Sequence, residues 1–362
     1  MRHPDEHLIH DPDLRAELEE ARGKFAFEMR VRVLAATQQR RDQERETAQA
    51  KARTLALLPR EKRRRAIIRE VMESTPPTQA DLRHIHSVLA VCGMPYDRPA
   101  PEVRRFEKKQ GNMSLLVQAG DLHGGEDDQW IPQPLPFGPK ARLLMMHLCS
   151  EAIKQKSPTV EIADSLSGFI REMGFPVTGG KKGTLHAFKE QINALAACDM
   201  KIGVWDGEAH TARTRRITPF DSIDVWLPTN PDQKMLWPST VTFNETFYKS
   251  LDRHALPINA KTVKAFAGSA RKLDLYFWIG YRLHSINTAN TTLHISWDAL
   301  AEQFGTGFTR PRAFRAQLAE ELAHIKEVLP KIPLKVTEQG LVLEPADISV
   351  LALPTPRATK KA

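Results

Sequence analysis

Residues 138–153 read GPKARLLMMHLCSEAI, and this stretch begins the best-patterned part of the chain. Its apolar residues form one stripe, which consists of Leu144, Met145, Leu148, Cys149 and Ile153. Apolar positions that recur three and four residues apart lie on one face of an α-helix. The stretch therefore predicts an amphipathic helix that packs against a core.

Two more helices are expected after this one. The second covers residues 162–173, carries an inward stripe and stops at Gly174. A turn at residues 178–184, TGGKKGT, leads into a third helix whose core stripe is Leu185, Phe188, Ile192 and Leu195. Two short strands, 202–205 and 223–227, are expected to close the unit. Three helices followed by a hairpin is the order of a winged-helix domain.

The same order recurs roughly 130 residues later. RKLDLYFWI at 271–279 corresponds to KARLLMMHL at 140–148, and ISWDAL at 295–300 corresponds to IADSL at 162–166. After a turn at 305–308, a third helix has a stripe of Phe314, Leu318, Leu322, Ile325 and Leu329, and a hairpin follows at 332–343. We predict an α+β, mainly helical fold with two tandem winged-helix domains, at 135–230 and 238–345.

The remaining segments differ in composition. Residues 1–77 mix Arg, Glu, Gln and Ala, and we expect a helical, partly disordered basic extension there. Residues 78–134 are expected to hold a helix from Thr78 to Cys92, followed by a linker rich in Gly and Pro that begins at Gly120. Residues 346–362 form a C-terminal tail. Three prolines between 228 and 238 predict a stiff connection that spaces the two domains.

The charge balance points to a polyanionic partner. The chain has 52 Lys and Arg against 44 Asp and Glu, which gives a formal charge of +8. Basic residues are densest in residues 51–72, at Lys51, Arg53, Arg60, Lys62, Arg63, Arg64, Arg65 and Arg69. Two readings of this segment stay open, a solvated helix face or a contact to a nucleic-acid backbone.

Several classes of protein are disfavoured. Cys92, Cys149 and Cys198 lie too far apart for a zinc clamp, and their odd number argues against a disulfide framework. The first twenty residues are strongly charged and no run of 18 apolar residues occurs. We therefore expect a cytoplasmic protein with no membrane partner.

Two motifs resemble functional sites without meeting their requirements. His84-Ile85-His86 resembles the metal motif of rolling-circle nicking enzymes, but on the expected helix the two imidazoles would diverge by about 200°. The turn at 178–184 resembles a nucleotide loop, but Gly180 stands where the lysine is required after Gly174 and Gly179. We expect no metal, no cofactor and no enzymatic activity.

The exposed sides of the two third helices supply the candidate DNA contacts, because this helix enters the major groove in helix-turn-helix folds. In the first domain the candidates are Lys181, Lys182, Thr184, His186 and Lys189, with Asn193 on the same face and the basic stretch Arg213, Arg215 and Arg216 nearby in sequence. In the second they are Thr309, Arg310, Arg312, Arg315 and Gln317. Arg312 and Arg315 are the expected base readers, because the guanidinium fork matches the guanine edge.

Four blocks resemble bacterial plasmid replication initiators of the RepA type, the RepA C-terminal family. They are HSVLAVCGMPY at 86–96, LPFGPKARLL at 135–144, GGKKGT at 179–184, and ISW at 295–297 with QFG at 303–305. In matching order, the resemblance covers about residues 75–353. It implies a protein that binds repeats at a double-stranded plasmid origin, promotes origin opening and recruits host replication proteins such as a helicase or initiator. A homodimer is a further expected state.

Two alternatives stay open at this point. A winged-helix transcriptional regulator, for example an autorepressor without initiator activity, would use the same two domains. A nicking nuclease would need a metal cluster and a nucleophilic tyrosine, and the chain has four tyrosines, at positions 96, 248, 276 and 281.

Overall fold

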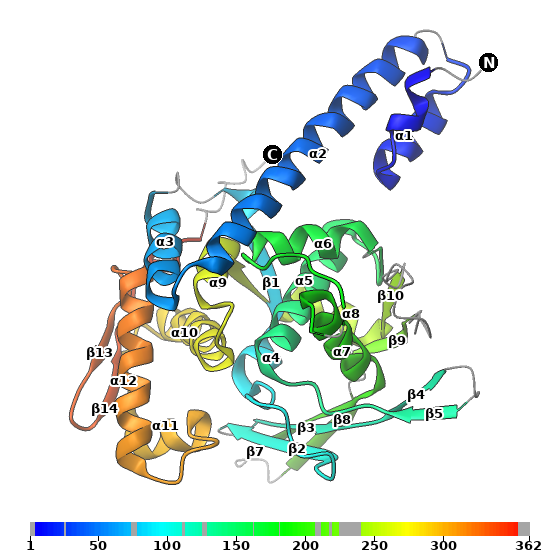
Figure 1. Ribbon diagram of the computed structural model, residues 1–362. Helices are drawn as coiled ribbons and strands as arrows, with labels where there is room; N and C mark the ends of the chain where they lie inside the picture. The colour runs from blue at the N-terminus through cyan, green and yellow to red at the C-terminus, as the bar shows by residue number, and fades with distance from the viewer. Residues whose placement is uncertain are drawn as a thin grey trace, which may run out of the picture.

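The computed structural model is a mixed α/β protein in which helices predominate (Figure 1). It describes residues 4–24, 27–73, 78–110, 113–124, 129–161, 163–180, 182–206, 211–216, 219–223 and 240–353. Lys181 and the proline-rich connection between 228 and 238 therefore lie outside the described residues.

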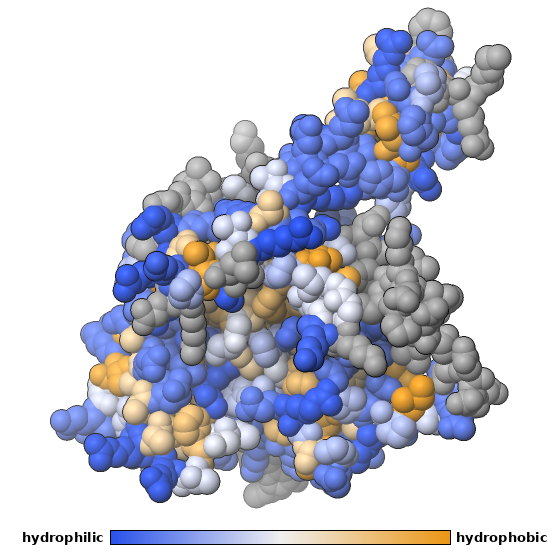
Figure 2. Space-filling view, viewed as in Figure 1, coloured by the Kyte–Doolittle hydropathy of each residue, from blue (hydrophilic) through white to orange (hydrophobic). Residues whose placement is uncertain are grey.

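The N-terminal extension is helical, as expected. It contains η1 (Pro4–Leu8), α1 (Pro12–Ala21), α2 (Phe27–Leu57) and α3 (Arg60–Glu73). Helix α2 projects from the body, and α1 folds back along its outer half (Figure 1). Figure 2 shows that α2 is mostly hydrophilic between its outer end and the body. The exposed helix α2 therefore carries a packed unit at its outer end, formed with η1 and α1 and called the tip module below.

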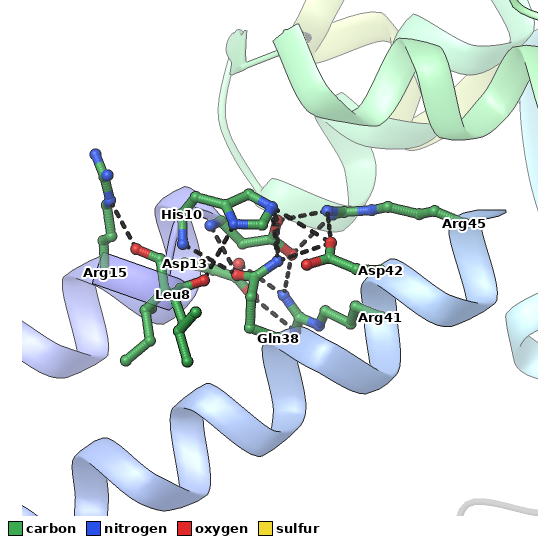
Figure 3. Close-up of polar contacts among 10 residues, drawn as sticks. Leu8, His10, Asp13, Arg15, Gln38, Arg41, Asp42 and Arg45 are labelled. Atoms are coloured by element: carbon green, nitrogen blue, oxygen red, sulfur yellow. Dashed lines mark hydrogen bonds and ion pairs between the residues drawn. The ribbon is translucent and has the colours of Figure 1, made fainter. Parts of the chain in front are cut away.

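This tip module has its own small core, formed by Ile9, Leu14, Leu18, Val31, Leu34 and Ala35. Buried Asp11 ties η1 and α1 to α2, because it accepts hydrogen bonds from Arg41 at 2.9 Å and from Arg45 at 2.7 Å; Figure 3 shows the surrounding polar contacts. Burial opposes ionisation of Asp11, but the bonds from Arg45 and Arg41 outweigh it and lower its pKa to about 2.

The first half of the body runs from residue 79 to residue 243. Its elements are η2 (Gln79–Asp81), β1 (Leu82–His86), α4 (Ser87–Cys92), β2 (Arg105–Gln110), β3 (Met113–Gln118), β4 (Asp121–Gly124), β5 (Gln129–Pro132), α5 (Gly138–Gln155), β6 (Thr159–Glu161), α6 (Ala163–Glu172), α7 (Thr184–Ala197), β7 (Asp199–Asp206), β8 (Thr211–Arg216), β9 (Phe220–Ile223) and β10 (Thr240–Phe243).

The second half follows directly. Its elements are α8 (Glu245–His254), β11 (Ala255–Asn259), α9 (Ala260–Phe266), α10 (Ala270–Ala289), β12 (Leu293–Ser296), α11 (Trp297–Phe304), α12 (Pro311–Val328), β13 (Leu334–Val336), β14 (Gly340–Leu343) and η3 (Ile348–Leu351).

The two halves repeat one order of elements. In the first half α5, β6, α6, α7, β9 and β10 follow one another, with the hairpin β7–β8 inserted after α7. In the second half α10, β12, α11, α12, β13 and β14 do the same. The three-stranded sheets have the orders β6-β10-β9 and β12-β14-β13, so in each the first strand pairs with the last. Each half thus holds three helices against a small antiparallel sheet.

The predicted helix from Thr78 to Cys92 is wrong. Leu82–His86 is strand β1, which pairs antiparallel with β11, and only Ser87–Cys92 is helical. His86 caps α4, because its Nδ1 accepts a hydrogen bond from the Val88 amide at 3.2 Å. Leu82, Ile85, Leu89 and Cys92 recur at helical spacing, but the sequence does not show that β11, far along the chain, pairs with residues 82–86.

The predicted linker and the first predicted hairpin also need correction. The linker from Gly120 contains the antiparallel hairpin β4–β5. Strand β7 pairs with β3 and β8, in a sheet of order β2-β3-β7-β8, rather than with the strand that follows near residue 223. That later strand, β9, ends at Ile223 and pairs with β10. Strand β7 thus pairs with its neighbour β8 and with β3, which lies about 80 residues earlier in the chain.

One continuous apolar core joins the two halves. The predicted stripes are buried, with Phe188, Ile192 and Leu195 on α7 and Phe314, Leu318 and Leu322 on α12. Helices α5 and α10 pack against each other at its centre, and α4 packs on α10. Cys92, Cys149 and Cys198 are free and buried. Among the described residues no helix has the length and apolarity needed to cross a membrane.

Candidate nucleic-acid interface

The N-terminus of α12 presents the densest group of predicted DNA contacts. Arg310 is its N-cap and Pro311 follows at the first position, where a fixed φ suits the start of a helix. Thr309, Arg310, Arg312 and Arg315 are all exposed. Because the apolar stripe of α12 is buried on the opposite side, these side chains face solvent. Glu320 is also exposed, two turns further along, so favourable charge is confined to the first turns.

A short turn fixes where this helix begins. Gly307 has a φ of +92°, a conformation that a side chain disfavours. The Phe308 ring lies 5.7 Å from the ring of buried Phe314, which anchors the turn to the first turn of α12. The guanidinium of Arg315 lies 5.6 Å from the ring centroid of Trp297 on α11. The Gln317 side chain is half-buried and donates a hydrogen bond to Glu321 at 3.2 Å, so it is not one of the exposed candidates.

Helix α7 holds the equivalent place in the first half and exposes less. Lys182, just before the helix, and His186 are exposed. Thr184 donates its backbone N–H to the Thr178 hydroxyl at 3.0 Å, and its own hydroxyl lies 3.1 Å from that oxygen. The turn before α7 is therefore closed by threonines, with Lys182 at its edge.

Lys189 and Asn193 do not lie on an exposed face. They are only 8% and 7% exposed, and burial lowers the pKa of Lys189. The helix packs on α5 on one side and contacts β4 and β9 on others. A helical wheel of α7 places both residues opposite the apolar stripe. It contains no information about other elements of the fold that pack against the helix. The prediction that Lys189 and Asn193 lie on an exposed face of α7 is therefore wrong, because both side chains are packed inside the protein.

The predicted basic stretch lies on strand β8. Arg213, Arg215 and Arg216 pair with Val204, Ile202 and Lys201 of β7. Strand β8 is the last strand of the sheet β2-β3-β7-β8. The stretch is thus part of an ordered hairpin rather than a connection between two strands of the first sheet.

The basic segment of the extension forms the end of α2 and helix α3, which packs against α9 and α12. Part of its charge is paired with the body, since Arg64 bonds to Glu327 of α12 at 2.6 Å. The Glu70 carboxylate of α3 accepts hydrogen bonds from the ammonium groups of Lys51 at 2.9 Å and Lys264 at 2.8 Å. Burial opposes ionisation of Glu70, but these bonds outweigh it and lower the pKa of the carboxyl group. Lys62 and Arg65 are exposed. Much of this segment therefore attaches the extension to the body.

The two histidines of the His-hydrophobic-His motif share one side of β1, because alternate strand residues point the same way. Because Nδ1 of His86 accepts from the Val88 amide, its Nε2–H donates to the Ser250 hydroxyl at 2.9 Å, and burial lowers the pKa of His86 to about 4. Within the described part of the chain, no group of three or more His, Cys, Asp and Glu residues could hold a metal.

Comparison with known proteins supports the resemblance seen in the sequence. Residues 135–299 match the family model of the plasmid-encoded RepA protein, and the predicted RepA-type resemblance is confirmed by this match. The matched region runs from just before α5 to the start of α11, so it includes the elements of the first half from α5 to β10 and those of the second half up to β12. Residues 135–299, a little under half of the chain, are therefore similar to the plasmid-encoded RepA protein.

Two crystal structures of domains 2 and 3 of RctB are similar in part. The selenomethionine derivative has a TM-score of 0.42 and 9% identity, and the similarity covers 66% of this chain and 85% of that one. The structure of RctB residues 155–483 has a TM-score of 0.43 and 10% identity, over 66% of this chain and 82% of that one. A search of curated proteins gave no match.

Proposed function

We propose that this chain is a plasmid replication initiator that binds double-stranded origin DNA through two winged-helix units. In this proposal α7 and α12 are the recognition helices, the protein binds repeated sequences, promotes origin opening and recruits host replication proteins. Support comes from the RepA-type region and from the matching element and sheet order of the two halves. The exposed Thr309, Arg310, Arg312 and Arg315 at the start of α12 are the observation that carries it.

The chemistry of this helix end suits DNA. Backbone N–H groups at a helix N-terminus attract phosphate, and an arginine can donate two hydrogen bonds to a guanine edge in the major groove. Helix α12 supplies both features within its first turns. Just before α7, the exposed Lys182 carries a compact charge, which suits contact with a phosphate better than recognition of a base edge.

We propose binding rather than catalysis as the activity. One of the four tyrosines, Tyr276, is poorly suited as the nucleophile of a nicking reaction, because it is buried, donates to the Leu351 carbonyl at 3.4 Å and accepts from the Asn259 amide at 3.1 Å. Burial raises the pKa of Tyr276 to about 12, which disfavours a nucleophilic phenolate.

Salt dependence of binding tests the proposal. The purified full chain is titrated against DNA that flanks its own coding sequence, between 50 and 200 mM salt. With six or more phosphate contacts, affinity should fall by on the order of a thousandfold over this range. A flat salt dependence contradicts DNA binding. DNA binding without replication of a plasmid that carries this DNA would identify the chain as a regulator instead of an initiator.

A further inference from the structure

We propose that a buried polar cluster between the two halves sets the spacing of the two DNA segments that the protein accepts, with Arg271 as the positioning residue. This inference rests on the proposed function. The cluster, called the junction below, consists of the buried residues Lys108, Arg142, Asp274 and Glu321 and the half-buried residues Tyr96 and Arg271. It lies where α5 of the first half meets α10 of the second.

The first element of the junction is a buried ion pair between the two halves. Arg142 of α5 donates to the two carboxylate oxygens of Asp274 of α10 at 2.6 and 2.8 Å. Its other donors bond to the carbonyls of Met94, Pro95 and Gly138. Burial opposes the charge of Arg142, but Asp274 outweighs it and raises the pKa of the guanidinium. A two-pronged contact with every donor satisfied allows one orientation of α5 against α10.

The second element connects α10 to the start of α12. Arg271, one helical turn before Asp274, donates to the Phe304 carbonyl at 3.1 Å and to the Thr306 carbonyl at 3.3 Å. Its Nη1 also lies 3.5 Å from the buried Glu321 carboxylate of α12. Arg271 thus holds both the turn before α12 and the helix itself. The position of the exposed arginines on α12 follows from these contacts.

The third element brings the first half to the same point. The guanidinium of Arg271 lies between two rings, 4.7 Å from the centroid of Tyr96 and 4.8 Å from that of Phe308. Arg142 lies 5.3 Å from the same Tyr96 ring. Lys108 of β2 reaches the Thr306 hydroxyl at 3.5 Å. Residues of the first half therefore contact the turn that begins α12.

Helix α7 is attached to this frame through α5. The two helices pack together, and the Gln191 side chain of α7 accepts a hydrogen bond at 2.8 Å from the Phe137 amide, at the N-cap of α5. Contacts therefore run from α7 through α5, the Arg142–Asp274 pair, α10 and Arg271 to α12. In this proposal, interactions between folded elements fix the relative position of the two helices.

A spacing series tests this proposal. The DNA segments that the full chain protects are first mapped, and fragments are then made with one to five base pairs inserted between them. For the unmodified chain, insertion of five pairs turns the segments to opposite faces of the duplex. Loss of simultaneous binding should lower affinity on the order of a hundredfold. In Arg271→Lys the charge is kept but the forked contacts are lost, and the drop should shrink to less than about tenfold.

Two further variants separate positioning from stability. Arg142→Met/Asp274→Leu replaces the buried pair by apolar side chains of similar size, which often preserves a fold. It should also flatten the spacing series, since the directional contact is gone. Arg83→Lys weakens the Arg83–Glu172 ion pair within the first half and should leave the series as steep as in the unmodified chain.

The outcomes distinguish the two proposals. If the unmodified chain protects no DNA, the proposed function fails and this inference fails with it. If it binds with a steep spacing series that Arg271→Lys and the double variant leave unchanged, DNA binding stands and the junction has no positioning role. If these variants have a lower melting temperature but an unchanged spacing series, the junction stabilises the fold and again has no positioning role. A flattened series in both variants and a steep one in Arg83→Lys supports the inference.

Discussion

Helices α7 and α12 occupy the same place in two halves of like topology, yet they present different chemistry. The start of α12 exposes three arginines, whereas α7 exposes Lys182 and His186 and buries Lys189. Strands β4 and β9 contact α7, while the first turns of α12 are open on the side opposite its core stripe. The difference teaches that two units of like topology can expose different side chains at equivalent helices, and under the proposed function base reading falls to α12 and backbone attachment to the turn before α7.

The largest expected effect comes from the contact that holds the two halves together. Arg142→Ala leaves Asp274 buried without its partner, which should lower the free energy of unfolding by about 3–5 kcal/mol. Arg312→Ala, at an exposed position, should change it by less than about 0.5 kcal/mol. Urea unfolding of the two variants measures both values. Equal losses would mean that the junction is not a structural contact between the halves.

The comparison predicts that base discrimination belongs to α12. Arg312→Ala and Arg315→Ala should each relax preference at particular base pairs by about 1–3 kcal/mol. Competition with single-base variants of the protected site measures this. His186→Ala, at an exposed position of α7, is the matched control and should leave the pattern of preference unchanged. Uniform weakening on all sequences by the two arginine variants would reverse the assignment.

Mild acid should destabilise the protein through a buried histidine of the first half. His147 of α5 is buried against Phe169, with ring centroids 4.5 Å apart, and burial lowers its pKa from 6.5 to about 3. Between these values the unfolded chain binds a proton that the folded chain does not, so stability falls as pH falls. From pH 7 to pH 5 this group should cost about 2 kcal/mol.

Urea unfolding at the two pH values checks this effect in His147→Phe, which keeps an aromatic ring and removes the titration. The variant should lose less stability than the unmodified chain on acidification. His294→Phe, at an exposed position on β12, should lose as much as the unmodified chain. An identical pH response in all three proteins would contradict burial of a neutral His147.

The smallest expected effect separates two lysines of α7 and its turn. Lys182→Ala, if it removes one phosphate contact, should lower the slope of log affinity against log salt by about one unit and weaken all sequences alike. Lys189→Ala should leave the slope unchanged, because that side chain is covered by protein. The same titration series measures both. A lower slope for Lys189→Ala would place that residue at the DNA after all.

The helices could be predicted because their apolar stripes are local patterns. The stripes of α5, α7 and α12 appear in the sequence at helical spacing, and all their expected residues are buried except Ile153 and Leu185, which are half-buried. The start of α12 could be predicted for the same reason, because Pro311 and the residues around it directly precede the core stripe of that helix in the sequence. A candidate whose exposure depends on its own helix alone is thus accessible from sequence.

The strands and the covered faces could not be predicted in the same way. Strand β1 pairs with β11, and β3 pairs with β7, across long separations that no local period records. The burial of Lys189 and Asn193 depends on elements outside α7. Arg271 was visible as a basic residue at the start of a repeated helix, but its contacts with Thr306 and Tyr96 exist only after the chain is folded.

The most direct measurement is a hydroxyl-radical footprint of the full chain on DNA that flanks its coding sequence, with and without Arg312→Ala. The account predicts two protected segments on one face of the duplex, about one helical turn or roughly 34 Å apart. Arg312→Ala should reduce protection at one segment before the other. A single protected segment, or equal loss at both, would contradict the claim that two units read the DNA in different ways.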